Sequence, residues 1–513
     1  MKNKILLNSF VNFSETVVNS ILNLVFLPVF IESWGAESYG LFLLGMTFTA
    51  ENFLGMFDFG VSKSLLIQVS KYHQSDKLNL EGVLRTSLIV FILIGVILCL
   101  LMMILSGKIV DFVFSLTGQE AENLQAIITI AGIGLLHQFP VKMIINYFLG
   151  GQDFIVVKLT QAVTAQTFYI LSLFFLVKGK DLIYIYKTYQ FVLFLNSLIL
   201  LYLFYRKKGV GFLFNFSEGI QWELFRNTKY LFLTNLSNAF NQQVDRILVG
   251  SFLSPAAITH FEIITKIPKF IKVGLGHVNS AILPSVGKFS SKKYIERIKN
   301  FFLLAAEAGA FVMFPFLAIL YYYAHEILLL WVGEELARDL FHYLRLFLLW
   351  VCFIHLAGLG WAILTGQGKQ LSKMARIYWV WSIVKMTIIL LFSEAYGFQA
   401  VLVASIVSAS IFWILSFTTF KKEFKIELNW LFRSYFLYGV ISFSTVILIG
   451  SGLDLLFINL GQGKFWFVFE SMILATCVMI INYLALSSST LKAELKKLRK
   501  KIMSKLSSKI IKS

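Results

Sequence analysis

Residues 5–31 read ILLNSFVNFSETVVNSILNLVFLPVFI, an apolar stretch long enough to cross a lipid bilayer as one helix. Polar residues interrupt this stretch at intervals of three, four and four, at Asn12, Glu15, Asn19 and Asn23. Because an α-helix turns once in about 3.6 residues, these four side chains lie on one face. The sequence therefore predicts a membrane-spanning helix with a polar face along its length.

The same intervals recur in residues 228–253, where Asn235, Asn238, Gln242 and Arg246 form a second polar face. A charged residue at the centre of a bilayer costs about 3 kcal/mol on insertion scales, so neither face is expected to contact lipid. Each face could pack against another polar helix, since hydrogen bonds between membrane helices are common. The recurrence favours a different interpretation, in which two related halves of the chain line one internal cavity.

The composition of the whole chain places it among integral membrane proteins. Of its 513 residues, 58% are hydrophobic and 14% are charged, and the mean hydropathy is +0.75. These values lie far from those of soluble globular domains. Windows of about 20 apolar residues predict an all-α polytopic protein with about fourteen transmembrane helices, near residues 5–31, 39–60, 83–105, 124–150, 155–177, 182–205, 228–253, 255–283, 299–324, 341–365, 375–396, 398–420, 432–453 and 464–486.

The net charge of +18 follows the predicted topology and does not require a nucleic-acid partner. Most of the 46 Lys and Arg residues lie in loops on the side of the N-terminus. The loops on the opposite side contain only Lys108, Lys178, Lys180, Arg338 and Lys464. By the positive-inside rule, both termini are expected in the cytoplasm.

The two polar faces lie in the first and seventh predicted spans, and an offset of six spans means that both halves enter the membrane in the same orientation. This arrangement predicts a parallel repeat. We expect a first six-helix lobe at 1–205, a cytoplasmic linker at 206–227, a second six-helix lobe at 228–420 and two further helices within 421–486. Residues 487–513 combine apolar residues at helical spacing with many lysines, which predicts an amphipathic tail on anionic membrane lipids.

Cations gather in the predicted span 255–283, at Lys266, Lys269 and Lys272. Together with Arg246 they outnumber the nearby carboxylates of Asp245 and Glu262 by two. An ion-pair cluster with a purely structural role could account for part of this charge. The surplus favours a phosphate-bearing ligand, because Lys and Arg form charge-assisted bonds with phosphate oxygens. Pro268 is expected to break the helix among these lysines.

The first predicted lobe also carries charged residues inside its spans. Glu15 and Glu51 are expected near the middle of the membrane, where a carboxylate could bind a coupling proton or Na⁺. Pairing of these carboxylates with Lys142 or Lys187 is the alternative that we favour. Lys142 follows Pro140 as Lys269 follows Pro268, which makes Lys142 a further candidate for ligand binding.

Motifs of enzymes and metal proteins are absent from the sequence. There is no Gly-x-x-x-x-Gly-Lys-Ser/Thr phosphate loop and no His-Glu-x-x-His or Cys-x-x-Cys spacing. No soluble segment is large enough to hold a catalytic core. We therefore expect a protein that is not an enzyme, hydrolyses no ATP, and binds no metal cofactor other than a possible coupling Na⁺.

Several short motifs resemble bacterial polysaccharide flippases of the O-antigen type, which belong to the MOP superfamily. They are Pro28-Val29-Phe30, Trp34-Gly35, Tyr39-Gly40-Leu41-Phe42, Asp58-Phe59-Gly60-Val61, Asp245-Arg246-Ile247-Leu248-Val249-Gly250 and Leu283-Pro284-Ser285. Related lipid II flippases have a cationic central cavity, and this chain differs in having no arginine in its first two spans.

The resemblance implies a V-shaped pair of six-helix lobes in the bacterial cytoplasmic membrane. Alternating access would move a polyprenyl-diphosphate-linked oligosaccharide to the outer leaflet for polysaccharide or lipopolysaccharide biosynthesis, alongside other membrane proteins of glycan assembly. The candidate substrate-binding residues are Arg246, Lys266, Lys269, Lys272, Lys142, Asn12, Asn19, Asn235, Asn238 and Gln242. Amide side chains suit sugar hydroxyls because amides both donate and accept hydrogen bonds.

Two other functions fit a polytopic protein of this kind. A MATE-like drug or metabolite antiporter would carry cations and would favour an acidic cavity, whereas the second lobe is predicted to be basic. A membrane glycan polymerase, ligase or glycosyltransferase usually needs a sizeable outer loop to bind its acceptor. The longest predicted outer segments, 106–123 and 325–340, are each shorter than about 20 residues.

Overall fold

The computed structural model describes residues 2–73, 77–211, 224, 232, 236–237, 240, 245–287, 295–366, 370–457, 466–485 and 491–492. These residues form helices, turns and bends, and none of them lies in a β-strand. Nine of the described helices are long and apolar enough to span a membrane, and shorter apolar helices cover Leu437–Leu453 and Glu470–Ala485. The prediction of an all-α polytopic membrane protein is confirmed.

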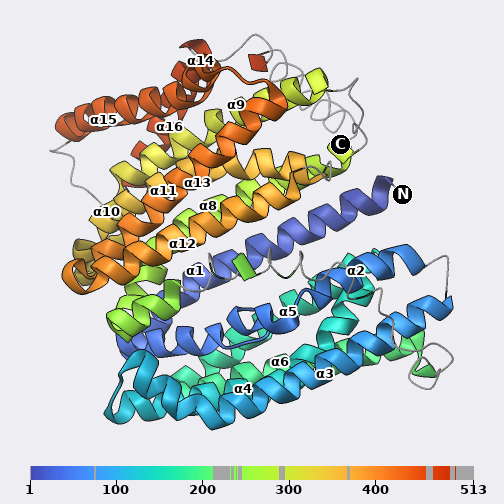
Figure 1. Ribbon diagram of the computed structural model, residues 1–513. Coiled ribbons are helices and arrows are strands. Elements are labelled where there is room, and N and C mark those ends of the chain that lie inside the picture. The colour runs from blue at the N-terminus through green and yellow to red at the C-terminus, as the bar shows by residue number, and fades with distance from the viewer. Residues whose placement is uncertain are drawn as a thin grey trace, which may run out of the picture. The chain divides into compact units, whose positions relative to one another are not determined.

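The helices in the first part of the chain, drawn in Figure 1, begin with one long helix and end before residue 212. They are α1 (Lys2–Thr47), the 3₁₀ helix η1 (Phe53–Asp58), α2 (Val61–Tyr72), α3 (Lys77–Lys108), the π-helix η2 (Ile109–Phe114), α4 (Gly118–Gly150), α5 (Phe154–Val177) and α6 (Leu182–Lys208). α3, α4 and α6 lie side by side, and α5 packs against both α1 and α6.

The remaining described helices follow a short helical segment at residues 245–252. They are α8 (Pro255–Gly287), α9 (Ile295–Tyr322), α10 (Ala324–Val332), α11 (Glu334–Gly366), α12 (Leu371–Tyr396), α13 (Phe398–Phe424), α14 (Leu428–Leu431), the π-helix η6 (Phe432–Phe436), α15 (Leu437–Phe457) and α16 (Trp466–Ala485). Every predicted span overlaps one of the described helices, although span 228–253 is described only at 232, 236–237, 240 and 245–253.

The chain falls into two compact units. The first contains Met1–Lys266 and Tyr378–Ala404, and the second contains Ile267–Ile377 and Ser405–Ser513. The lobes 1–205 and 228–420 and the helical pair within 421–486 stay a prediction. The structure describes only 206–211 and 224 of the predicted linker 206–227, and only 491–492 of the predicted tail 487–513.

A break at Gly35 divides α1 into two helical parts, which correspond to the first predicted span and the start of the second. Gly35 has φ +78°, a left-handed conformation that glycine adopts without steric penalty. After this break, Gly40 brings α1 against the start of α8, where a Cβ at position 40 would overlap the Pro255 carbonyl. The Thr259 hydroxyl also donates to the Ala36 carbonyl at 2.6 Å. Both contacts join α1 to α8 within the first unit.

The prediction of a continuous second helix at 39–60 is wrong. α1 ends at Thr47, the chain turns, and η1 precedes α2. Phe59 and Gly60 have φ +50° and +82°, and the Asp58 carboxylate accepts a hydrogen bond from the Gly60 N–H at 2.8 Å. These two left-handed residues end the 3₁₀ helix and redirect the chain into α2.

Four buried hydrogen bonds hold the turn that follows α1. The Ala50 N–H donates to Gln138 at 2.9 Å, and the Gln138 amide donates to Gln190 at 3.0 Å. Gln190 donates to the Tyr186 hydroxyl at 3.1 Å, and that hydroxyl donates to the Gly45 carbonyl at 2.8 Å. This chain of side chains from α4 and α6 binds the Gly45 carbonyl and the Ala50 N–H, one on each side of the end of α1.

The expectation that Pro268 breaks its helix is also wrong. α8 is helical from Pro255 to Gly287, straight through Pro268. Proline is tolerated inside membrane helices because neighbouring helices and local adjustments compensate for the missing hydrogen bond. The lysines near Pro268 therefore lie on one continuous helix.

In the second unit, α9, α15 and α16 enclose an apolar core of Ala318, Tyr323, Val446, Leu474 and Val478. Two buried polar pairs lie within the packed helices of this unit. The Tyr438 hydroxyl donates to the Glu307 carboxylate at 3.1 Å, and His355 contacts the Tyr435 hydroxyl at 2.9 Å. These contacts fit a structural role, since buried polar groups need hydrogen-bond partners.

Candidate functional site: a polar cavity in the first unit

The first unit contains a cavity of about 410 Å³ that opens between α1, α5, α6 and the start of α8. Residues on both sides of the α1 break contribute to its wall, together with Glu51 from the following turn and Arg246 from the helical residues 245–252. All of the lining residues belong to one compact unit. The cavity is therefore a feature of this unit alone.

Three charged side chains meet at one end of the cavity. The Arg246 guanidinium donates to Glu262 Oε2 at 2.8 Å, and the Lys266 ammonium donates to Glu262 Oε1 at 2.7 Å. The Glu262 side chain is 4% exposed, whereas the Arg246 and Lys266 side chains are 18% and 17% exposed. One deeply buried carboxylate thus holds two cations that remain partly accessible from the cavity.

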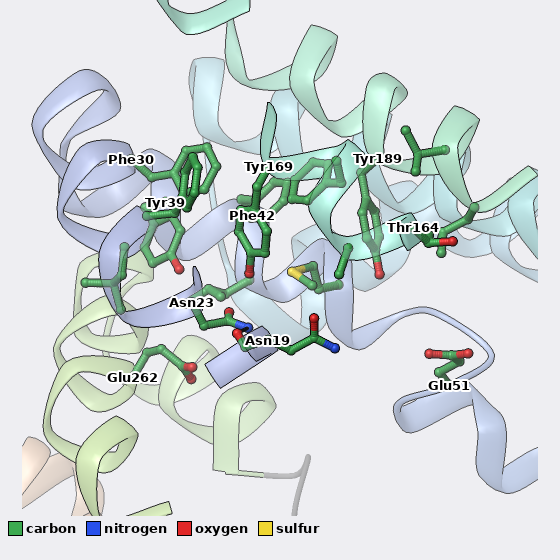
Figure 2. A pocket seen from close by; sticks show the side chains of 18 of the residues that line it. Asn19, Asn23, Phe30, Tyr39, Phe42, Glu51, Thr164, Tyr169, Tyr189 and Glu262 are labelled. Carbon is green, nitrogen blue, oxygen red and sulfur yellow. Dashed lines mark hydrogen bonds between the residues drawn. The ribbon is translucent and has the colours of Figure 1, made fainter. Parts of the chain in front are cut away.

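A fourth charge, Glu51, lines the cavity at a distance from this cluster. Figure 2 shows Glu51 at the opposite side of the view from Glu262, in the turn after α1. Among the described lining residues, Arg246 and Lys266 therefore balance Glu51 and Glu262. The surplus of two that was counted from the sequence also included Lys269, Lys272 and Asp245, which are not among the described residues of this wall.

Amide side chains from three helices supply hydrogen-bonding groups to the wall. Asn19 and Asn23 lie on the polar face of α1, where Asn23 accepts from the Lys266 ammonium at 3.4 Å and donates to the Asn19 carbonyl at 2.9 Å. Gln161 of α5 and Asn196 of α6 also line the cavity. The Asn196 Oδ1 atom is buried and has no hydrogen-bond partner among the described residues. A ligand hydroxyl could satisfy this oxygen.

An aromatic wall faces these amides. Figure 2 shows the rings of Phe30, Tyr39, Phe42, Tyr169 and Tyr189 along the side opposite Asn19 and Asn23. The rings support one another through contacts such as Phe26 with Tyr169 at 4.6 Å and Phe168 with Tyr189 at 5.1 Å between ring centroids. The cavity therefore offers apolar faces on one side and hydrogen-bonding groups on the other.

The sequence-predicted residues are distributed as follows. Asn19, Glu51, Arg246 and Lys266 line the cavity. Asn12 and Glu15 belong to α1, but their side chains are outside the described part of the structure. The structure does not describe the other three predicted residues, Asn235, Asn238 and Gln242.

The other predicted lysines do not line this cavity. Lys142 lies 3.9 Å from the Asp58 carboxylate and donates to the Gly55 carbonyl at 3.4 Å. Lys269 and Lys272 follow the boundary at Lys266 and belong to the second unit, where the Lys272 ammonium lies 5.1 Å from the centre of the Trp350 ring.

The charge count made from the sequence omitted Lys385. This lysine of α12 pairs with Asp245 at 2.7 Å, and both side chains are nearly buried. Asp245 therefore neutralises Lys385, and Glu262 is shared by Arg246 and Lys266. A lysine in an apolar span indicates that it needs a carboxylate partner, so Lys385 could have been included in the count. Its spacing in the sequence does not indicate which distant carboxylate it pairs with.

Sequence reasoning also missed the wall residues of α5 and α6. Gln161, Thr164 and Asn196 are polar residues in apolar spans, which could have identified them. Tyr169 and Tyr189 carried no such signal, because aromatic residues are common in any membrane helix.

A second pocket in the first unit, of about 510 Å³, is lined entirely by apolar side chains. They come from the end of α1, η1, α3, η2 and residue 247, and include Phe48, Phe53, Leu98 and Phe114. Such a pocket has no side-chain hydrogen-bonding groups for a polar ligand. The polar cavity is therefore the candidate functional site.

Two family models match the chain. The model described as polysaccharide biosynthesis protein matches residues 5–290, which is more than half of the sequence. The MatE model matches residues 231–388. No curated protein sequence matches the chain.

Solved structures share the fold across most of the chain. The lipid II flippase MurJ in an inward closed conformation is 14% identical, with a TM-score of 0.72, and covers 93% of this chain and 97% of its own. An inward-facing multidrug resistance MATE family transporter is 15% identical, with a TM-score of 0.68, and covers 81% and 98%. A MOP superfamily transporter from Pyrococcus furiosus, described as having a binding pocket of reverse polarity, is 14% identical with a TM-score of 0.59 and covers 83% and 96%.

These relatives are flippases and transporters rather than enzymes. The expected family is confirmed by the match over residues 5–290 and by the shared fold. The chain is a multi-pass membrane protein that belongs to the polysaccharide biosynthesis protein family and shares its fold with flippases and transporters.

Proposed function

We propose that this protein moves a polyprenyl-diphosphate-linked oligosaccharide from the cytoplasmic to the outer leaflet of a bacterial cytoplasmic membrane. Both termini would lie in the cytoplasm. The observation that carries the proposal is the cavity in which Arg246 and Lys266 stand beside amide and aromatic side chains. Each part of that wall matches one chemical part of the substrate.

The diphosphate would bind at Arg246 and Lys266. An arginine guanidinium has five N–H donors and a lysine ammonium has three, so both keep donors free after their bonds to Glu262. Both side chains are partly exposed, which leaves those donors accessible. Charge-assisted bonds to phosphate oxygens are stronger than neutral hydrogen bonds.

The sugars would bind along the remainder of the cavity. Asn19, Asn23, Gln161 and Asn196 provide donors and acceptors for hydroxyl groups. The rings of Tyr39 and the other aromatic residues offer flat apolar surfaces to the C–H faces of a sugar. Both kinds of contact tolerate different sugars, which suits a transporter more than a catalytic site of strict geometry.

Transport by alternating access requires two conformations of similar free energy. A ligand shifts such an equilibrium only by its difference in affinity for the two states. A coupling proton or Na⁺ could supply part of that difference, and Glu51 is a carboxylate in the cavity wall that could bind it.

The test is translocation by purified protein in liposomes, using a short-chain prenyl-diphosphate sugar with a fluorescent label. Lys266→Ala and Arg246→Ala are each expected to reduce transport at least about tenfold, since a hydrogen bond to a charged group contributes about 1.5–3 kcal/mol. Each single variant leaves Glu262 with one cation partner, so folding is expected to persist.

Lys187→Ala is the matched control, because Lys187 is an exposed lysine of α6 that does not line the cavity. The control should transport at the rate of the unmodified protein. Full transport by the double variant Lys266→Ala with Arg246→Ala would remove the proposed role of these cations.

A MATE-like antiporter is the second candidate, because the MatE model matches residues 231–388 and the cavity contains Glu51 and Glu262. An antiporter would use these carboxylates to bind an organic cation. Binding of cationic dyes that is lost in Glu51→Gln, without any binding of the prenyl-diphosphate sugar, would favour this function.

A further inference from the structure

The Glu262 carboxylate binds the same nitrogen atoms of Arg246 and Lys266 that a diphosphate would bind. Its two carboxylate oxygens lie 2.8 Å from Arg246 Nη2 and 2.7 Å from Lys266 Nζ. The Glu262 side chain is 4% exposed and lies deeper than either cation. This carboxylate therefore binds the two cations in the way that an anionic ligand would bind them.

The charges near Glu262 do not neutralise an incoming dianion. Arg246 and Lys266 share one carboxylate, Glu262, because Glu51 lies at the other end of the cavity. This cluster therefore has a net charge of +1, and a dianionic diphosphate would leave one negative charge uncompensated by the described lining residues. Burying uncompensated charge is unfavourable, and a buried carboxyl group usually responds by taking up a proton.

We propose that Glu262 releases Arg246 and Lys266 to the diphosphate and takes up a proton in exchange, so that substrate and proton bind together. This inference rests on the proposed function. A neutral carboxyl group no longer competes for the two cations. It also gains an O–H donor that can bind a phosphate oxygen, whereas a carboxylate can only accept.

The groups around Glu262 identify it as the residue that titrates. Tyr39 of α1 and Tyr169 of α5 also face it, and tyrosine hydroxyls stay protonated across neutral pH. Asp245, next to Arg246 in sequence, is paired with Lys385 at 2.7 Å. Glu51 lies at the other end of the cavity, away from the two cations (Figure 2).

The expected pH dependence follows from the two states of the cavity. In the empty cavity, Arg246 and Lys266 keep Glu262 ionised. In the occupied cavity, the phosphates satisfy these cations and their negative charge favours the neutral carboxyl group. Binding therefore takes up a proton, and substrate affinity falls as pH rises.

The experiment uses the full-length protein in lipid nanodiscs and a short-chain prenyl-diphosphate–N-acetylglucosamine, whose diphosphate diester stays dianionic across neutral pH. Calorimetric titration in two buffers of different ionisation enthalpy measures the protons taken up on binding. The unmodified protein is expected to take up about one proton, so its Kd rises about tenfold per pH unit. Glu262→Gln should take up none, and its Kd should not change with pH.

Glu307→Gln is the matched control, because Glu307 is also 4% exposed but lies in α9 of the second unit, bonded to Tyr438. It should keep the proton uptake of the unmodified protein. If Glu262→Gln does not fold, the pH dependence of Kd in the unmodified protein still tests the inference, because a Kd that does not change with pH excludes proton uptake on binding.

The outcomes separate this inference from the proposed function. If the unmodified protein binds the ligand without proton uptake, or if Glu262→Gln keeps the uptake, the role of Glu262 is overturned and the flippase function stands. If the unmodified protein does not bind the ligand at all, the proposed function itself fails.

Discussion

Arg246 and Lys266 share one carboxylate, but the two cations are not equivalent. The guanidinium of Arg246 is planar and can bind a phosphate through two parallel N–H groups, whereas the ammonium of Lys266 is a point charge. Lys266 and Glu262 are one helical turn apart on α8, so their pairing is local. Arg246 comes from a different helical segment and joins that segment to α8.

Arg246→Lys is therefore expected to weaken binding of the prenyl-diphosphate sugar about tenfold, although it preserves the charge. The loss corresponds to about 1.4 kcal/mol, roughly that of one charge-assisted hydrogen bond. Lys266→Arg, which preserves charge and adds donors, is the matched comparison and should bind at least as tightly as the unmodified protein. Equal affinity of Arg246→Lys and the unmodified protein in calorimetry would show that only charge matters at position 246.

At the scale of elements, the break in α1 determines where the cavity wall lies. The polar face of Asn19 and Asn23 precedes Gly35, and Tyr39 and Phe42 follow it, yet all four residues line the same cavity. The segment after Gly35 is held against α8 by the close approach at Gly40 and by the Thr259 hydrogen bond. The backbone contact between α1 and α8 thus positions both sides of the site.

Gly40→Ala is expected to destabilise the protein by about 1–3 kcal/mol, because the added methyl group overpacks a backbone contact. Transport should fall along with stability, since α1 and α8 both line the cavity. The matched control is Gly452→Ala in α15, where an added Cβ meets no atom within 4 Å. Thermal unfolding in detergent should show a lower Tm for Gly40→Ala only. An unchanged Tm for both variants would contradict the close packing at Gly40.

The proposed function of the whole molecule is to move a glycolipid from one leaflet of the membrane to the other. A flippase acts after the lipid-linked unit is assembled and before it is joined to others outside. The chain belongs to the polysaccharide biosynthesis protein family and shares its fold with a lipid II flippase, and its substrate needs a direct test.

Deleting the gene is expected to leave the lipid-linked oligosaccharide on the cytoplasmic leaflet, because a diphosphate and its sugars cross hydrocarbon very slowly without a polar path. Labelling of intact and permeabilised cells with a lectin would locate the glycan. The unmodified gene should restore outer-leaflet glycan, and a gene carrying both Arg246→Ala and Lys266→Ala should not. Accumulation of single units on the outer leaflet would instead favour a glycan polymerase.

Much of the fold could be predicted from local patterns. Runs of apolar residues placed the spans at 83–105, 124–150 and 182–205 within the observed α3, α4 and α6. The prediction of a continuous helix at 39–60 was wrong because apolar content does not reveal the turn after Thr47. Buried groups from α4 and α6 stabilise that turn. The prediction of a helix break at Pro268 was wrong because it relied on a local preference. Proline tends to break helices, but this tendency is overridden inside membrane-embedded helices.

The amino-acid sequence alone indicates a polytopic membrane protein. It also indicates a polar face on the first helix and cations near the start of α8. Hydropathy and helical spacing depend only on residues close together in the chain, so they can be read without a fold. Only the tertiary structure shows that Lys385 neutralises Asp245 and that Arg246 and Lys266 share Glu262. It also shows that aromatic rings of α5 and α6 face the amides of α1. Those pairings join distant segments, and only the packing of the helices brings the partners together.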